Sequence, residues 1–265
     1  IKTTILISGI IQTDETFKNN QNINSVKIDF YVQQIGPRSF HKCSSLTSVN
    51  IPSSIISIGE ESFKECTSLA DISIPSSVNS LCDSSFANCS SIRSITIPSS
   101  ITSIGKQTFS DCASLIQIAL PISVTKIPDS CFAGCSSLTQ IIIPNSVTFI
   151  GCHAFSGCAS LAQITIPYSV TYIGNSAFLN CTSLIQITIP SSIKSIEDST
   201  FLGCTTLTQV TIPSSVSSIG EGAFLNCYLL IDIVIPCSVT IIKNRTFRKC
   251  MTLRRLTIPD SITSI

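Results

Sequence analysis

A repeat of 23 residues, without insertion or deletion, runs through most of this chain of 265 residues. Ten cysteines recur at this interval from Cys43 to Cys250; a Phe precedes each by three residues and a Pro follows each by nine. A fixed period of this kind is the signature of stacked repeats, because one unit cannot bury its apolar face alone. The period therefore predicts a solenoid in which each repeat forms one rung.

Each rung reads C-x-S-L-x-x-I-x-I-P-x-S-V-x-x-I-G-x-x-A-F-x-x, as between Cys158 and Asn180. Alternation at Ile164 and Ile166 indicates a short, half-buried strand. The Pro that follows has no N–H for a sheet, so it ends the strand. We expect the apolar residues after it to point inward on a return path, and Gly174 to permit the turn between the two.

The repeat sets the predicted organisation of the chain. Residues 1–19 fit the pattern poorly and are predicted to form an N-terminal cap or degenerate repeat, and residues 20–265 to form the solenoid. Residues 20–42 are a degenerate rung with Asn20 in the Cys slot and Asp29 in the Pro slot, and ten rungs follow from Cys43. The sequence starts at Ile1 and stops at Ile265 within a rung. We expect a longer array, or self-association through this uncapped last rung.

The signature L-x-x-I-x-I-P…V-x-x-I-G-x-x-A-F-x-x-C resembles the BspA-like leucine-rich repeat family over residues 20–265. The resemblance implies a right-handed leucine-rich-repeat solenoid with a parallel β-sheet on its concave face and mostly irregular or short return elements on the convex side. It also implies recognition rather than chemistry, either as a protein-interaction scaffold or as a cell-surface adhesin. The sequence departs from the general leucine-rich repeat at one slot, where it has Ser, from Ser54 to Ser261, in place of Asn or Cys. Ser is a weaker hydrogen-bonding partner for the turn backbone, so the curvature of the solenoid is left open.

Composition argues against several partners. The 16 basic and 15 acidic residues give a net charge of +1, so no bulk field attracts nucleic acid or anionic lipid. Mean hydropathy is +0.45, yet the apolar runs are far shorter than the ~18 residues of a spanning helix. We therefore expect another protein as the partner, with no membrane span.

The cysteines are predicted to be structural. The ten in the repeat point the same way from neighbouring rungs, which suits small buried hydrophobes better than disulfides. Free thiols favour a reducing, cytoplasmic compartment, whereas the resemblance allows the cell surface. Four cysteines fall in other slots and are the better candidates for reactive thiols: Cys82, Cys131, Cys152 and Cys237.

No catalytic, cofactor or metal motif is predicted. His41 with Cys43, and His153 with Cys152 and Cys158, lack the paired spacings of structural zinc sites. On the predicted strands, Asp71 and Asp232 are seven rungs apart, about 34 Å, which is too far for joint acid–base work. We expect a protein that is not an enzyme.

Three sets of residues are candidates for partner binding. The first is a concave-face column with five consecutive glutamines, which can bond one another as an amide ladder or offer a neutral floor to a partner beside Ile116, Ile142 and Ile185. The second is a set of aromatic residues in variable slots, which are either anchors for a partner or isolated rings on the surface. The third is a basic patch near the C-terminal end; the alternative interpretation is that these residues form an ordinary solvated edge. The residues are Gln117, Gln140, Gln163, Gln186 and Gln209; Phe149, Tyr168 and Tyr172; and Arg245, Arg248, Arg254 and Arg255.

Overall fold

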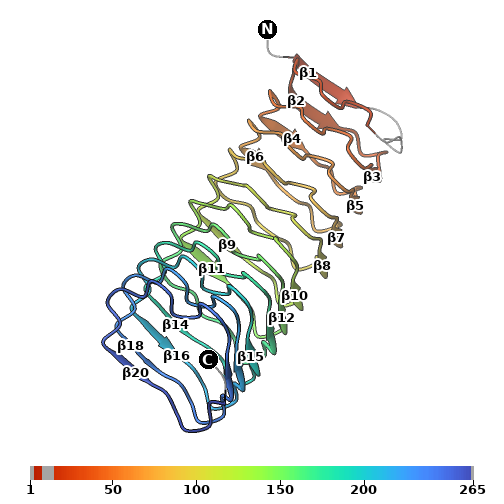
Figure 1. The fold of residues 1–265 in the computed structure, drawn as a ribbon. Coiled ribbons are helices and arrows are strands. Elements are labelled where there is room, and N and C mark those ends of the chain that lie inside the picture. Colours follow the sequence, from red (N-terminus) through yellow and green to blue (C-terminus); the bar gives the residue numbers. More distant parts are fainter. Residues whose placement is uncertain (1–2, 8–14, 264–265) are drawn as a thin grey trace.

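The protein is an elongated stack of rungs, each lying on the one before it (Figure 1). The computed structural model describes residues 3–7 and 15–263, and these residues form parallel strands and turns without any helix. Within that part of the chain, nothing has the length and apolar character of a membrane-spanning helix. The predicted solenoid is confirmed.

One line of strands follows the L-x-x-I-x-I segments. From Ile23 onward neighbouring strands pair in parallel with a register of 23 residues, as Ser48 with Asp71, and the strand before them pairs with an offset of 20 to 21 residues. We call the outward side chains of all the L-x-x-I-x-I segments the strand face. The strands are β1 (Thr3–Ile7), β2 (Ile23–Ile28), β4 (Ser48–Asn50), β6 (Asp71–Ile72), β9 (Gln117–Ala119), β11 (Gln140–Ile142), β14 (Gln186–Thr188), β16 (Gln209–Thr211), β18 (Asp232–Val234) and β20 (Arg255–Thr257).

This sheet is interrupted twice. Ser94 forms only an isolated bridge with Gln117, and the rung of Gln163 contains no strand in its L-x-x-I-x-I segment. At that second position Ile164 is half-buried, whereas Ile141 and Ile187 in the adjoining rungs are buried. Regular strand pairing is therefore weakest in the middle of the strand face.

The return path is also formed by strands, of two residues each and all parallel. They are β3 (Gln34–Ile35), β5 (Ser57–Ile58), β7 (Ser80–Leu81), β8 (Ser103–Ile104), β10 (Lys126–Ile127), β12 (Phe149–Ile150), β13 (Tyr172–Ile173), β15 (Ser195–Ile196), β17 (Ser218–Ile219) and β19 (Ile241–Ile242). We call their outward side chains the return face. The prediction of short return elements is confirmed, while the right-handed course and the concavity of the strand face stay predictions.

At the N-terminal end, β1 continues the first sheet by pairing in parallel with β2. Residues 20–42, despite their degenerate sequence, make a complete rung with β2 and β3. The boundary at residue 19 stays a prediction, because residues 1–2 and 8–14 of the proposed cap lie outside the described residues. The end of the last rung, residues 264–265, lies outside them as well.

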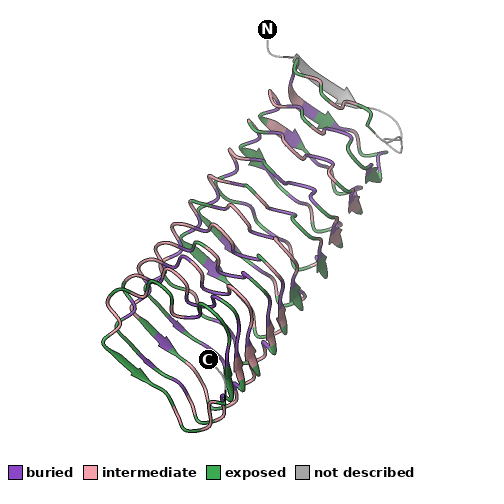
Figure 2. Ribbon diagram, viewed as in Figure 1, coloured by how far each residue is buried: buried purple, intermediate pink, exposed green. Residues whose placement is uncertain are grey.

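The core is a column of phenylalanines between the two lines of strands and the turns that follow. From Phe40 to Phe247, successive rings stack with centroids 5.2 to 5.9 Å apart and planes within 11°. Phe17 extends this column by one ring. Buried residues line the inside of the rungs before Cys250, and exposed residues lie on the outer surfaces of the stack (Figure 2). Stacking thus buries the apolar residues as the period predicts.

The repeated cysteines have a role beyond filling space. In all ten rungs from Cys43 to Cys250, the thiol donates its hydrogen to the carbonyl oxygen of the Phe 26 residues earlier, with Sγ–O distances of 3.0 to 3.3 Å. That oxygen belongs to the Phe one repeat before the Phe that directly precedes the Cys, so each thiol ties two successive turns of the stack together. The fourteen cysteines are free, and nine of the ten in the column are buried.

The repeated serines also link rungs. Ser54 Oγ donates to Val32 O over 2.7 Å, Ser215 Oγ donates to Ile193 O over 2.7 Å, and the same bond recurs in every rung between them. The expectation that Ser is a weak partner for its own turn missed this role, because the acceptor is in the rung before.

Gly174 is required for a different reason from the predicted turn. Its φ is not positive, but a Cβ added there would lie 2.5 Å from the backbone nitrogen of Cys152 in the preceding rung. The residues with positive φ lie instead two residues before or two residues after a Phe of the column, such as Gln107 and Asp111 around Phe109. We call each segment from two residues before the Phe to the following Cys a Phe–Cys turn. Glycine therefore permits close stacking at this slot.

We predict that Phe155→Ala lowers the free energy of unfolding by roughly 3 to 5 kcal/mol, because it leaves a cavity in a fully buried, doubly stacked position. Phe149→Ala is the matched control, since that ring is only half-buried. Urea unfolding of both variants checks this; equal losses would contradict a core made by the Phe column.

Candidate protein-binding face

The five glutamines form one continuous column on the strand face. In β9, β11, β14 and β16 the central apolar residue points into the core, so the Gln before it points outward and is exposed. Register places Gln117 beside Gln140 and Gln186 beside Gln209, and Gln163 lies in the rung between these pairs. The structure therefore brings these predicted residues together.

Their amides do not form the ladder that was one interpretation of the column. Within the described residues, none of these five side chains makes a hydrogen bond, either with each other or with other groups. Each amide retains two N–H donors and an acceptor oxygen. The column can therefore offer its hydrogen-bonding groups to a partner.

Shallow depressions follow this column. One of about 500 Å³ is lined by Gln163, Gln186, Gln209 and Tyr168 among others. A second, of about 430 Å³, lies over Ser94, Gln117, Gln140 and Ile142. The amides thus border hollows large enough to receive side chains of another molecule.

Exposed apolar residues flank the amides. Ile116, Ile142 and Ile185 lie on the strand face with 46%, 56% and 48% of their surface exposed. Ile122 and Tyr168, at 81% and 76%, stand at its edge, where the chain turns after Pro. Ile122 was not among the predicted residues, although it occupies the same slot as Tyr168 two rungs earlier. Together these side chains give the neutral face an apolar component.

The three predicted aromatic anchors do not form one site. Phe149 in β12 and Tyr172 in β13 stack on the return face, with centroids 5.0 Å apart and planes 15° apart. Tyr168 follows the Pro that ends the strand segment and borders the strand face. The separation arises because the chain changes direction at this Pro, which puts neighbouring slots on different sides of the rung.

The predicted basic patch is also divided. Arg255 belongs to β20 and Arg254 directly precedes it, on the strand face. Arg245 and Arg248 lie in the Phe–Cys turn, where the Arg245 guanidinium is 3.6 Å from the Glu221 carboxylate. Four residues that are close in sequence thus occupy two sides of the last rungs.

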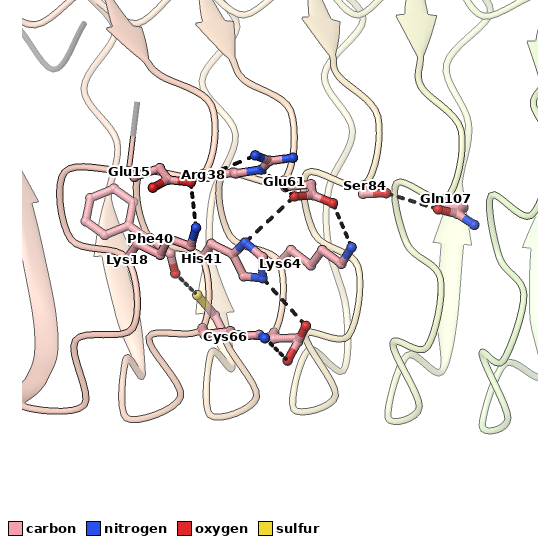
Figure 3. A network of polar contacts seen from close by, with 12 residues as sticks. Glu15, Lys18, Arg38, Phe40, His41, Glu61, Lys64, Cys66, Ser84 and Gln107 are labelled. Carbon is pink, nitrogen blue, oxygen red and sulfur yellow. Dashed lines mark hydrogen bonds and ion pairs between the residues drawn. The ribbon is translucent and has the colours of Figure 1, made fainter. Parts of the chain in front are cut away.

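A cluster of charges lies on the N-terminal Phe–Cys turns (Figure 3). Glu61 accepts from Lys64 Nζ and from Arg38 Nε, both at 2.7 Å. His41 lies 3.7 Å from Glu61 and 3.6 Å from Glu65, and burial lowers the pKa of its imidazole. The hydrogen bond from Lys64, then that from Arg38, lowers the pKa of Glu61 to about 2. The contacts of Arg38 and His41 link two adjacent rungs, and the Lys64–Glu61 pair lies within one rung; all are away from the strand face.

Glu61→Gln should weaken the protein at neutral pH but not in acid. Because the folded pKa of Glu61 is depressed to about 2 from 4.5, its contribution is present above pH 4.5 and is lost as the pH falls towards 2. Urea unfolding at pH 7 and pH 2.5 should show the difference between wild type and variant shrinking. A difference independent of pH would contradict the ion-pair role.

The four cysteines outside the column differ in exposure. Cys237 is exposed, Cys82 and Cys152 are half-buried, and Cys131 is buried with its thiol pKa raised by that burial. In the column, burial raises the pKa of Cys43 to about 11 and that of Cys112 to about 12. Since the thiolate is the reactive form, the column thiols and Cys131 are protected.

We predict that a thiol reagent at pH 8 labels Cys237 first, Cys152 and Cys82 next, and the nine buried cysteines of the column only on unfolding. Peptide mapping of timed labelling measures this order, and Cys237→Ser should remove the fast phase. Fast labelling of Cys158 in the folded protein would contradict the burial of the column.

In the part of the chain that the structure describes, no group of three His, Cys, Asp or Glu side chains is arranged to hold a metal ion.

Sequence and structure comparisons agree on the family. The sequence matches the BspA type leucine rich repeat region over residues 11–139, 125–254 and 218–265. This chain belongs to the BspA-type leucine-rich repeat family. No curated protein matches it.

Solved structures of leucine-rich repeat proteins support the fold. A leucine-rich repeat protein from Bacteroides ovatus is 32% identical, with a TM-score of 0.67, over 96% of this chain and 77% of that one. A leucine rich cell surface protein from Faecalibacterium prausnitzii is also 32% identical, with a TM-score of 0.58, over 96% and 82% of the two chains. A protein from Eubacterium ventriosum, at 23% identity and TM-score 0.62 over 98% and 87%, shares the fold.

Proposed function

We propose that this BspA-type protein is a non-catalytic scaffold that binds another protein through its strand face. The observation that carries the proposal is the column of five exposed, unbonded amides beside exposed isoleucines. Amides and apolar side chains together suit a protein surface, which offers backbone and side-chain hydrogen bonds as well as apolar contacts.

The chemistry of the face supports binding over catalysis. Its acids, Asp71 and Asp232, are separated by seven rungs, about 34 Å, so they cannot act on one substrate. From Ser94 through Thr211 the outward residues of the strand segments are uncharged. A partner of this central region is therefore recognised by hydrogen bonding and shape rather than by charge.

Gln140→Lys combined with Gln186→Lys should reduce partner capture at least tenfold, because two buried ammonium groups would lack partners in the complex. The test is capture of a partner from an extract of the source cells, followed by affinity measurement with that purified partner. Both positions are exposed, so thermal unfolding should be unchanged. The matched control is Ser103→Lys on the return face with Thr125→Lys, which is exposed and directly precedes β10. Unchanged affinity in the Gln double variant would reject the strand face as the site.

A second candidate function is that of a cell-surface adhesin. It is favoured by the 32% identity to the Faecalibacterium prausnitzii protein, which is described as a cell surface protein. Labelling of intact cells that express the full-length protein separates the two candidates: a surface adhesin reacts with an impermeant reagent, and an internal scaffold does not.

A further inference from the structure

The charged residues of the strand face are unpaired in the single chain. Between β4 and β20 they are Asp71, Arg93, Asp232, Arg254 and Arg255, and all are exposed. None forms an ion pair among the described residues, even though Asp232 and Arg255 are register partners in β18 and β20. The ion pairs that the structure contains lie on other sides, as Arg38 with Glu61 and Lys106 with Asp129.

These charges are arranged symmetrically about the rung of Gln163. Asp71 lies four rungs before it and Arg255 four rungs after it, in the same column. Arg93 is in the third rung before it and Asp232 in the third rung after it. At equal distances from the centre, the two halves of the face therefore carry opposite charges.

We propose that the strand face binds a second copy of this chain, face to face and with the stacks antiparallel. This inference rests on the proposed function and names its partner. A two-fold axis along the strand direction through Gln163 superposes each column on itself and reverses the order of the rungs. Asp71 of each copy then faces Arg255 of the other, with Arg254 adjacent, and the rung of Arg93 faces the rung of Asp232.

The neutral middle of the face is self-complementary under the same operation. Gln140 faces Gln186, and Gln163 faces its own copy; an amide both donates and accepts, so each can bond its counterpart. Both stacks repeat at the strand spacing of ~4.8 Å, so contacts made at one rung recur at the next. A partner without this period could not match all five amides.

The parallel arrangement is disfavoured by charge. An axis along the stack would set each rung against itself, with Asp71 on Asp71 and Arg255 on Arg255, and like charges across an interface are repulsive. The sign pattern therefore selects one orientation.

The area of the interface is modest. Eight rung intervals of ~4.8 Å and strand segments of about five residues give roughly 600 Å² on each copy. This is below the ~800 Å² per partner of a typical stable complex. The association is therefore expected to be weak, reversible and sensitive to salt.

Sedimentation equilibrium of the 265-residue chain tests the proposal by charge swapping. Wild type should dimerise, and D71R or R255D alone should raise the dimer dissociation constant at least tenfold. The double variant D71R/R255D should regain the wild-type value, because the exchanged charges again face opposite charges across the interface. An equimolar mixture of the two single variants should form a heterodimer for the same reason. K126D on the return face, also exposed and unpaired, is the control and should dimerise like wild type.

Each outcome decides a stated point. A wild-type chain that stays monomeric at about 0.5 mM, well above the micromolar range of weak specific complexes, or a dimer unaffected by D71R and R255D, would overturn the inference. Failure of the double variant to recover, with unfolding unchanged, would overturn the antiparallel pairing. The proposed function would survive those results if capture of another protein still depended on Gln140 and Gln186, and it would fall with the inference if it did not.

Discussion

The contact between one rung and the next is the interaction on which this molecule depends. Phe rings stack, thiols donate to a Phe carbonyl of the turn before, and serine hydroxyls donate to the backbone of the preceding rung. All three links connect fixed slots of adjacent repeats. The constant length of the repeat is therefore a requirement of the packing, because one inserted residue would misalign every link in its rung.

Much of the fold could be predicted because the period alone assigns residues to the core. Phe155, Cys158 and Ile173 recur at one slot each, and recurrence of an apolar residue in a stack implies an inward position. The partners of their polar groups could not be predicted. The thiol of Cys158 bonds to Phe132 O, and finding that acceptor requires the offset between rungs in three dimensions.

The candidate site was predicted in part for a similar reason. The Gln column was found because every rung puts its strand segment on the same side. Tyr168 lies apart from Phe149 and Tyr172, and the sequence could not show this because the corner after the Pro was not located. Likewise, Arg245 and Arg255 are close in sequence, but the turn between their slots places them on separate sides. Sequence distance within a rung is thus a poor guide to which side a residue occupies.

The bonds between rungs have one more consequence, for how the length of such a protein can change. Loss or gain of a whole repeat leaves every remaining unit with a suitable neighbour, whereas any fractional change does not. The gain of one repeat between Asp71 and Arg255 would move the midpoint between them by half a rung, from the centre of a rung to the gap between two rungs. The number of repeats between the charged ends would then act as a ruler, so that copies of unequal length would no longer match.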